Sequence, residues 1–375
     1  MSTLEIRAQK GKEIASMERA VIRLDETTYK VASQSSRSIY EILSTENGWI
    51  CQCADHMYRG VKCKHIWAVE FSFAIRKEVS KLIEPIHVEG CLYCGALGLL
   101  KVGIRHNKCG DLQKFQCKAC HKYFTINIGF EKMKHSPQGI TAAMQLYFSG
   151  ESLRNTQKSL RLLGVQVSHN TIYVWIRKYS SLMEKYLDKI TPQVGNAWRT
   201  DELYVKVRGN MKYLFALMDD ETRFWIAQQV AEHKGTSDVK PLFKEGKRIA
   251  GKNPSTLISD GAPNFADAFS EFYTNTKPRT THIREITLDG ERHNNKMERL
   301  NGELRDREKT MRGLKIDETP ILKGMQIFHN FVRPHEALSG KTPSEAAGIK
   351  VNGDNKWLTL IQNASQTKND KEISE

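Results

Sequence analysis

The fold of the largest part of this chain is decided by the stretch Arg199-Thr200-Asp201-Glu202-Leu203-Tyr204-Val205-Lys206-Val207. Apolar and polar residues alternate along it, which is the period of a β-strand with one buried face. Asp201 shares the apolar face with Leu203 and Val205. A carboxylate on such a face is unfavourable unless it is paired or bound to a metal. Glu202, on the other face, has the position of an ordinary exposed acid.

The elements expected downstream continue this sheet. They are strands at 211–218 and 223–230, a helix near 236–250, a short strand at 255–259, a strand at 282–286 and a long helix from Asn294 or Asn295. The expected order is three antiparallel strands followed by two strands that alternate with helices. This is the element order of an RNase H-like α/β fold with a five-stranded mixed sheet. Its fourth strand pairs beside its first, about 4.8 Å away. Asp260, which ends the fourth strand, is therefore expected to share a metal pair with Asp201.

A third acid is expected from the long helix. Met297, Leu300 and Leu304 form its apolar stripe, and Glu298 lies away from that stripe. Arg305 follows two turns later, about 20° from Glu298 around the helix axis. One face thus presents a carboxylate and then a cation, which suits a metal ligand followed by a phosphate contact. The competing third acids are Asp289, Glu291 and Glu303.

All eight cysteines lie between residues 51 and 120. Their spacing favours metal over disulfides, because nothing marks the chain for export. The first cluster, within residues 1–80, offers Cys51, Cys53, Cys63 and His65. Three thiolates and one imidazole satisfy tetrahedral zinc; the alternative is buried free thiols beside a surface histidine. With a β-rich lead-in and a helix near 64–77, this pattern resembles the SWIM zinc module.

The second cluster joins two Cys-x-x-Cys motifs within residues 88–130. Its candidate ligands are Cys91, Cys94, Cys117 and Cys120, with Cys109 and His121 as alternatives. Paired motifs of this kind predict a four-cysteine zinc ribbon. A zinc-free redox pair is the other interpretation, but no thioredoxin-like βαβ pattern surrounds either motif. Four protein ligands leave no open position, so the two Zn2+ ions expected per chain organise small folds rather than catalyse.

Residues 136–190 predict three short helices with Gly150 and Gly164 at the joints. A basic third helix after such a turn resembles a helix-turn-helix, although any small helical bundle shares the pattern. As a helix-turn-helix, the third helix enters a major groove of DNA. The candidate contacts are Asn170 and Thr171, with His169 and Tyr173, near base edges, and Arg177 and Lys178 near phosphates.

Charge and composition restrict the class of protein. The 375 residues carry a net charge of +14, and the first 200 residues hold a surplus of 12 positive charges against 2 in the rest. This distribution indicates polyanion binding upstream, with a solvated basic surface as the alternative. No apolar run approaches the roughly 18 residues of a membrane span, and the N-terminus lacks an apolar signal segment. An intracellular, multidomain protein without membrane attachment is expected.

Three motifs carry a family resemblance. Residues 200–204 (Thr-Asp-Glu-Leu-Tyr), 258–261 (Ile-Ser-Asp-Gly) and 293–299 (His-Asn-Asn-Lys-Met-Glu-Arg) look like the acidic motifs of insertion-sequence DDE transposases, in the retroviral-integrase-like superfamily. The 37 residues between Asp260 and Glu298 are close to that group's usual spacing, and Arg305 matches its basic residue. Residues 328–343 look like its C-terminal segment. The resemblance covers about residues 88–348, with a catalytic domain at 196–348.

The resemblance implies metal-dependent cutting and joining of double-stranded DNA at the ends of a mobile element. Two Mg2+ or Mn2+ ions held by Asp201, Asp260 and Glu298 would clamp the scissile phosphate. Hard carboxylates suit Mg2+, whereas soft thiolates suit zinc. Joining two ends implies a homodimer or higher oligomer on DNA, in the cytoplasm or at the nucleoid.

Two other functions stay open at this point. One is a domesticated zinc-dependent DNA-binding regulator without strand transfer, and the other is a plain nuclease that hydrolyses without joining. The SWIM-like front departs from the commonest layout of the family, and its partner, DNA or protein, is not indicated. Polar residues 360–375 predict a frayed, flexible tail.

Overall fold

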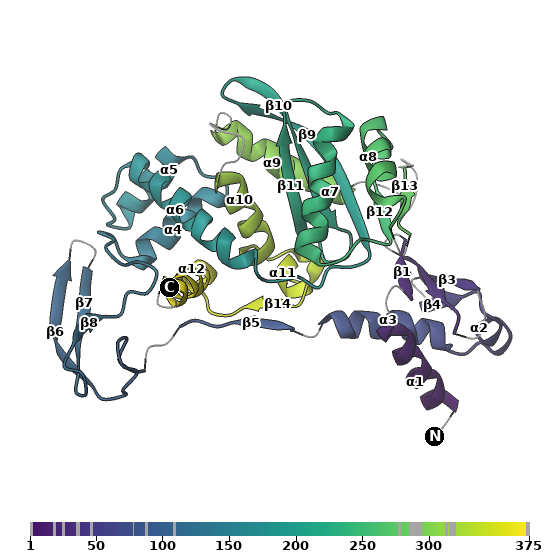
Figure 1. The fold of residues 1–375 in the computed structure, drawn as a ribbon, viewed down its shortest axis with the longest axis horizontal. Helices are drawn as coiled ribbons and strands as arrows, with labels where there is room; N and C mark the ends of the chain where they lie inside the picture. Colours follow the sequence, from purple (N-terminus) through teal and green to yellow (C-terminus); the bar gives the residue numbers. More distant parts are fainter. Residues whose placement is uncertain are drawn as a thin grey trace. The chain divides into compact units, whose positions relative to one another are not determined.

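The computed structural model describes residues 3–17, 20–24, 27–34, 38–45, 48–77, 79–86, 89–107, 110–276, 279–284, 295–311, 314 and 320–372 (Figure 1). The chain forms two compact units. One contains residues 1–81, 191–317 and 334–349, and the other contains residues 82–190, 318–333 and 350–375. Within the part of the chain that the structure describes, no helix is long and apolar enough to cross a membrane.

The first unit begins with a small α/β module. Its antiparallel sheet has the order β1 (Val21–Arg23), β2 (Thr28–Ala32), β3 (Ile39–Thr45) and β4 (Gly48–Cys51). Two helices, α2 (Ala54–Arg59) and α3 (Lys64–Lys77), follow, and α1 (Thr3–Ser16) packs on α3. The packing is close, because a Cβ on Gly11 would lie 2.4 Å from Trp67 Cβ. The core is small and includes three buried cysteines.

The same unit contains the five-stranded mixed sheet expected from the sequence, in the order β11-β10-β9-β12-β13. Its strands are β9 (Ala197–Val207), β10 (Asn210–Asp219), β11 (Trp225–Ala231), β12 (Thr256–Ile258) and β13 (Thr281–Ile283). β9, β10 and β11 are antiparallel, whereas β12 runs parallel to both β9 and β13. The predicted pairing of the fourth strand with the first is confirmed, and so is the predicted five-stranded mixed α/β sheet.

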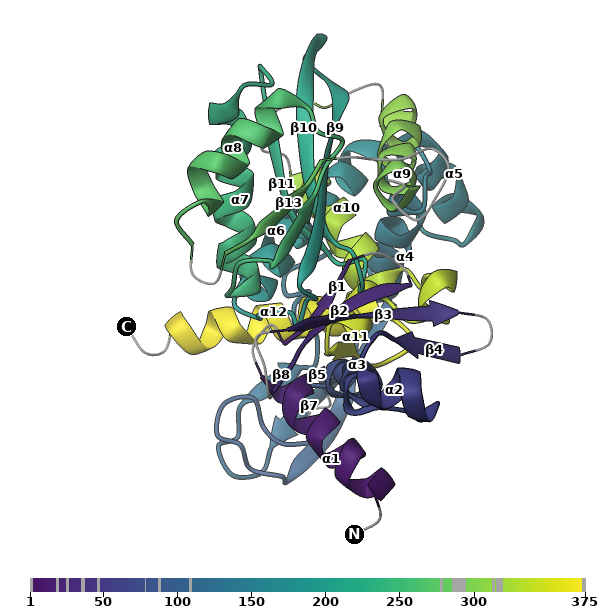
Figure 2. The ribbon, with the colours of Figure 1, turned by 90° about the vertical axis from the view of Figure 1, so that its right-hand side faces the viewer.

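Helices cover both faces of this sheet. Figure 2 shows α7 (Thr236–Ala250) and α8 (Pro263–Tyr273) on one side and α9 (Asn295–Met311) on the other. α7 lies close to the sheet, because a Cβ on Gly246 would lie 2.4 Å from Leu217 Cδ2. α9 turns its apolar stripe inward as predicted: Met297, Leu300 and Leu304 are buried. The short elements η2 (Glu336–Leu338) and α11 (Pro343–Ala346) also belong to this unit.

The second unit combines a β-ribbon with a helical bundle. The ribbon strands are β6 (Leu99–Asn107), β7 (Gly110–Cys117) and β8 (Tyr123–Thr125), all antiparallel. Three helices follow, α4 (Pro137–Phe148), α5 (Leu153–Leu162) and α6 (His169–Leu187). Each is capped at its N-terminus by a serine hydroxyl, from Ser136, Ser152 and Ser168 respectively. β5 (Lys81–Ile83) and β14 (Ile349–Val351) form a separate two-stranded sheet.

Segments from the C-terminal part of the chain complete the helical bundle. α10 (Pro320–Ile327) and the π-helical turn η1 (Phe328–Val332) fall within residues 318–333, which belong to this second unit. They pack there through apolar contacts: Phe148 of α4 stacks on Phe328 with ring centroids 6.4 Å apart, and a Cβ on Gly324 would lie 2.2 Å from Phe148. The expected catalytic domain, 196–348, spans these residues too, and its bounds stay a prediction.

The expectation of a frayed tail from residue 360 is wrong for residues 360–372. They continue α12 (Lys356–Glu372). Trp357, Leu360, Ile361 and Ala364 repeat at helical spacing and are all buried. Trp357 also stacks on Phe148 at 5.4 Å. Polar composition hides this stripe, because only one face of the helix is apolar.

Candidate active site and metal-ligand clusters

Asp201 and Asp260 lie together because β9 and β12 are parallel neighbours. Ile258, the last residue of β12, pairs with Arg199 of β9, so that Asp260, two residues later, lies beside Asp201. Glu202 joins them, and carboxylate oxygens of these three acids lie within 4.8 Å of one another. The structure therefore brings two of the three predicted acids to one point and adds a neighbour.

Glu202 is not the exposed acid that strand alternation predicts. Its side chain is 12% exposed, and its carboxylate lies 3.4 Å from Lys234 Nζ. Phe215 pairs directly opposite Glu202 on β10, and Phe265 of α8 packs edge-on against Phe215 with centroids 5.9 Å apart. α8 therefore covers this face of the sheet near Glu202, and alternation along one strand carries no information about such a covering helix.

Burial and neighbouring negative charge raise the pKa values of Asp201 and Glu202. Burial raises the pKa of Asp201 to about 7, and the negative charges of Glu202 and Asp260 act in the same direction. The side-chain amide of Asn301 opposes this shift by donating a 2.9 Å hydrogen bond to Asp201 Oδ2. Burial and the charge of Asp260 also raise the pKa of Glu202. A cluster of partly buried carboxylates is electrostatically unfavourable without a bound cation.

Glu298 lies exposed on the first turn of α9. It is not within 4.8 Å of both Asp201 and Asp260 in this structure. Asn301, one turn further along α9, contacts Asp201, so that Glu298 is on a helix that touches the acid cluster. Arg305 is exposed on the same helix. The residues that lie outside the described part of the chain include Asp289, Glu291, His293 and Asn294.

A buried ion cluster joins the two elements that carry the acids. Arg199 of β9, Asp220 after β10 and Lys296 of α9 have side chains that are 2%, 0% and 6% exposed. Arg199 pairs with Asp220, and Lys296 Nζ lies 3.0 Å from the same carboxylate oxygen and donates to the Asp220 carbonyl. Arg199 and Lys296 each stand two residues before a predicted ligand, Asp201 and Glu298 respectively. No spacing pattern reveals this cluster, because its members come from three separate elements.

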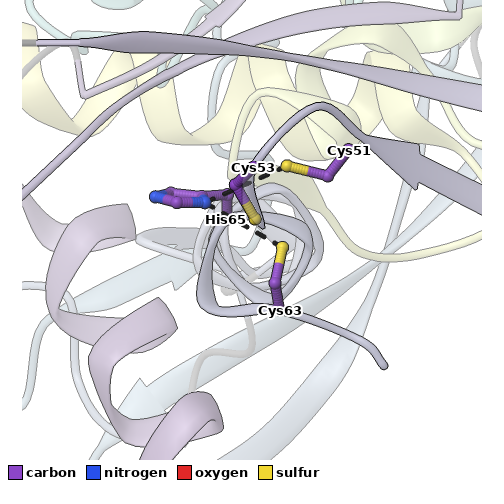
Figure 3. A group of neighbouring side chains, drawn as sticks. All are labelled: Cys51, Cys53, Cys63 and His65. Atoms are coloured by element: carbon purple, nitrogen blue, oxygen red, sulfur yellow. Dashed lines mark hydrogen bonds between the residues drawn. The ribbon is translucent and has the colours of Figure 1, made fainter. Parts of the chain in front are cut away.

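The first cysteine cluster has the geometry of a tetrahedral metal site (Figure 3). Its four ligand atoms, from Cys51, Cys53, Cys63 and His65, lie within 4.8 Å of one another. His65 Nδ1 is 3.9 Å from the sulfurs of both Cys51 and Cys63. Zinc bonds of about 2.0–2.3 Å give ligand–ligand edges of about 3.7 Å, so the donors fit. A hydrogen bond with Cys51 lowers the pKa of Cys63 to about 3.

The second cluster also fits a four-coordinate metal. The sulfurs of Cys91 and Cys120 are 3.6 Å apart, and those of Cys94 and Cys117 are 3.5 Å apart. All four lie within 4.8 Å of one another. A hydrogen bond from the Cys120 backbone N–H lowers the pKa of Cys117 to about 6. His121 is exposed and outside this group, and Cys109 lies outside the described residues.

α6 presents one face to solvent. Ile172, Trp175, Ile176 and Tyr179 are buried on the opposite side. Of the predicted DNA contacts, Asn170, Arg177 and Lys178 are exposed and Thr171 is half-buried. Arg177 stacks over the Tyr173 ring at 5.6 Å. The polar side chains are therefore available at the surface, and their contact with DNA stays a prediction.

The segment that contains the sheet matches a family model. Residues 195–335 match the family model DDE_Tnp_IS240, described as a DDE domain. With two acids converging on the sheet, this match identifies the segment as a DDE domain. The chain is similar to the Staphylococcus aureus transposases for the insertion sequence-like element IS431mec (strain Mu50) and for IS257 in transposon Tn4003. Each similarity is 32% identity over 129 residues, covering 33% of this chain and 55% of the relative. The chain thus spans about half the length of the curated relatives it matches.

The solved structures with a partial likeness to this chain include two retroviral proteins. The HTLV-2 integrase catalytic core domain in complex with magnesium has a TM-score of 0.31 at 18% identity, covering 41% of this chain and 94% of that one. The simian T-cell lymphotropic virus intasome in complex with the PP2A regulatory subunit B56 gamma has a TM-score of 0.33 at 15% identity, covering 54% and 72%.

Replacing Lys296 with Met tests the buried ion cluster. The substitution leaves Asp220 with one cation fewer in a fully buried site, which should lower the unfolding free energy by about 3 kcal/mol. Urea unfolding followed by circular dichroism measures this change. Lys309→Met on the same helix is the matched control, because Lys309 pairs with Asp306 at 3.2 Å but is 78% exposed. It should change stability by less than about 0.5 kcal/mol. Equal effects of the two substitutions would contradict the role of the cluster.

Asp201→Asn should stabilise the metal-free protein at high pH. The pKa of Asp201 is about 7 in the folded chain and has its usual value of 3.8 in the unfolded chain. Between these two pH values, the folded chain keeps a proton that the unfolded chain has released. Stability contributed by this group therefore falls as pH rises from about 4 to 7. At pH 8 with a chelator, the Asn variant should melt roughly 4 °C higher than the wild type, with no difference near pH 4. Asp267→Asn, an exposed change on α8, is the control. A pH-independent difference would refute the assigned shift.

Proposed function

We propose that the chain is a transposase that cuts and joins DNA at the ends of an insertion sequence. The observation that carries this proposal is the convergence of Asp201 and Asp260 inside a segment that matches a DDE domain. The similarity to the IS431mec and IS257 transposases supports the same function. Because the chain spans only part of those relatives, its activity, substrate and partners are inferred from the chemistry of its own residues.

The acid cluster fits a pair of divalent cations. Glu202 Oε2 is buried and has no hydrogen-bond partner among the described residues, and the pKa of Asp201 is raised by burial. Hard carboxylate oxygens favour Mg2+ or Mn2+ over softer metals. Bound there, two such ions would supply Lewis acidity to the scissile phosphate and activate the attacking hydroxyl.

The protein side chains then have distinct tasks. Asp201 and Asp260 would hold the cations beyond the carboxyl end of β12, and Glu298 of α9 would supply the third ligand. Asn301 orients Asp201 through the hydrogen bond that it donates. Arg305, two turns after Glu298 and exposed, is placed to contact a phosphate of the bound strand. No covalent bond between protein and DNA is required.

We assign zinc to both cysteine clusters, in a SWIM-like module at 1–80 and a zinc ribbon at 88–130. Thiolate-rich, four-ligand sites favour zinc and leave no open position for substrate.

Sequence-specific recognition is assigned to the helix-turn-helix at 136–190, with Asn170 and Thr171 reading bases and Arg177 and Lys178 holding phosphates. A reaction that joins two ends requires at least two active sites, so the active form is a homodimer or larger on DNA, at the nucleoid.

The activity is tested with duplexes that carry the sequences flanking the gene. In Mn2+, the wild-type chain should nick these ends and join them to a second DNA. Asp260→Asn should reduce both products roughly a thousandfold, because several kcal/mol of charge stabilisation are lost. Asp267→Asn, the exposed change on α8, should leave the products unchanged.

Three outcomes would replace the proposal. Nicking without joined products would indicate a plain nuclease. Sequence-specific binding without nicking would indicate a DNA-binding regulator. Undiminished products from Asp260→Asn would remove Asp260 from the chemistry.

The chain is expected to contain two zinc ions, one for each cluster. Cys63→Ser and Cys117→Ser should each remove one ion and lower the melting temperature, because each small module has a metal at its centre. His121→Ala should retain both ions. Plasma emission spectrometry after anaerobic purification gives the count. Retention of both ions by the Cys117→Ser variant would show that its cluster is not a metal site.

A further inference from the structure

A short stretch of β9 beside the acid cluster is open to solvent on one face, where Tyr204 and Lys206 are exposed. β12 ends at Ile258, opposite Arg199, so that β9 beyond Asp201 has no strand on that side in the described chain. The next recorded pairing there is an isolated bridge between Val207 and Leu314. Tyr204 lies in this interval and is 52% exposed.

An aromatic pair occupies this open stretch. Tyr204 and Tyr213 face each other across β9 and β10. Their ring centroids are 4.8 Å apart, and the Tyr213 hydroxyl lies 3.3 Å from the Tyr204 hydroxyl. The pairing restricts the rotamers of both rings, so the exposed ring is held in position before any ligand arrives.

A cation links the aromatic pair to the acids. Lys234, on the segment that follows β11, has Nζ 3.4 Å from Glu202 Oε1 and 5.9 Å from the centre of the Tyr213 ring. Its side chain is 49% exposed. The charge of Glu202 raises the pKa of Lys234, so the ammonium keeps its charge at physiological pH. The acid cluster, the Lys234 ammonium and the Tyr204–Tyr213 pair thus lie next to one another, as a series in that order.

The spacing of this series matches one step along a nucleic-acid strand. Tyr204 is two residues after Glu202 on the same face of β9, about 7 Å away along the strand. A phosphate at the acid cluster would therefore place its adjoining nucleotide over Tyr204, and Lys206 continues the same exposed face. Aromatic rings beside cations are the ordinary chemistry of single-strand binding.

We propose that Tyr204, Tyr213 and Lys234 bind an unpaired nucleotide next to the scissile phosphate. Its base stacks on the Tyr204 ring, and its phosphate contacts the Lys234 ammonium. The base must leave the duplex to reach the ring, which is least costly at a nick or a single-stranded end. This inference rests on the proposed function, since it assumes that the acid cluster holds a DNA phosphate. It predicts tolerance of base identity at that position, because every base has a stacking face.

Stacking is tested by fluorescence with the full chain. The probe is a short duplex with a single-stranded 3′ tail that contains 2-aminopurine, in Ca2+ so that binding is measured without cleavage. The wild type should quench the probe. Tyr204→Ala should abolish the quench and weaken binding roughly tenfold, with unchanged affinity for the blunt duplex. Tyr204→Phe should retain both properties. Wild-type quench and affinity in Tyr204→Ala, or no quench by the wild type, would overturn the inference.

The phosphate contact is tested by salt dependence. For the tailed probe, Lys234→Gln should lower the slope of log affinity against log salt by about one unit relative to the wild type, because one counterion fewer is released. Lys234→Arg should keep the slope, and so should Lys244→Gln, an exposed lysine on α7. An unchanged slope in Lys234→Gln would overturn the contact.

These binding experiments separate the two proposals. Nicking and joining that depend on Asp260, together with an inert Tyr204→Ala substitution, would remove the nucleotide site and leave the transposase function standing. Quenching that depends on Tyr204, without any nicking in Mn2+, would leave a nucleotide-binding site and remove the transposase function.

Discussion

Two cations buried in the DDE domain, Arg199 and Lys296, share one carboxylate, Asp220, and the geometry of the acid cluster depends on this interaction. A buried charge that loses its partner is strongly destabilising, so β9, the turn after β10 and α9 are held in one arrangement. Each cation precedes a predicted metal ligand by two residues. The sheet can therefore tolerate an acid cluster that raises the pKa of Asp201, because the surrounding elements cannot move apart to relieve it.

The cysteine clusters bear on a different question, which is how a module with a small hydrophobic core is stabilised. The ribbon has a hydrophobic cluster whose fully buried members are only Cys91, Cys117 and Phe124, among the described residues. So small a core contributes little stability by itself, and metal binding is the usual substitute. Hard oxygen donors at the sheet and soft sulfur donors upstream would keep the proposed catalytic and structural metals apart by chemistry. In this proposal, one chain binds both kinds of metal, and no separate step is needed to direct each metal to its own site.

The sheet was predictable because its signals are local. Alternation identified β9, and the apolar stripe of α9 placed Met297 and Leu300 inside. The features that the sequence did not predict share one cause, which is contact between segments distant in the sequence. Glu202 is covered because α8 packs over Phe215, and residues 318–333 join the helical unit because aromatic rings from α4, η1 and α12 stack together. Composition also concealed α12, whose apolar residues form a single face.

The sequence by itself determined the order of strands and helices, the two groups of cysteine and histidine side chains that lie together, and the acids at position 201 in β9 and position 260 after β12. Residue periodicity and ligand spacing are properties of neighbouring positions, so they can be seen without a fold. Only the tertiary structure decided that Glu202 joins the acids, that Arg199 and Lys296 meet at Asp220, and that Tyr204 and Lys234 border the site. These relations depend on strand register and helix packing, which bring residues together across distances that no local pattern encodes.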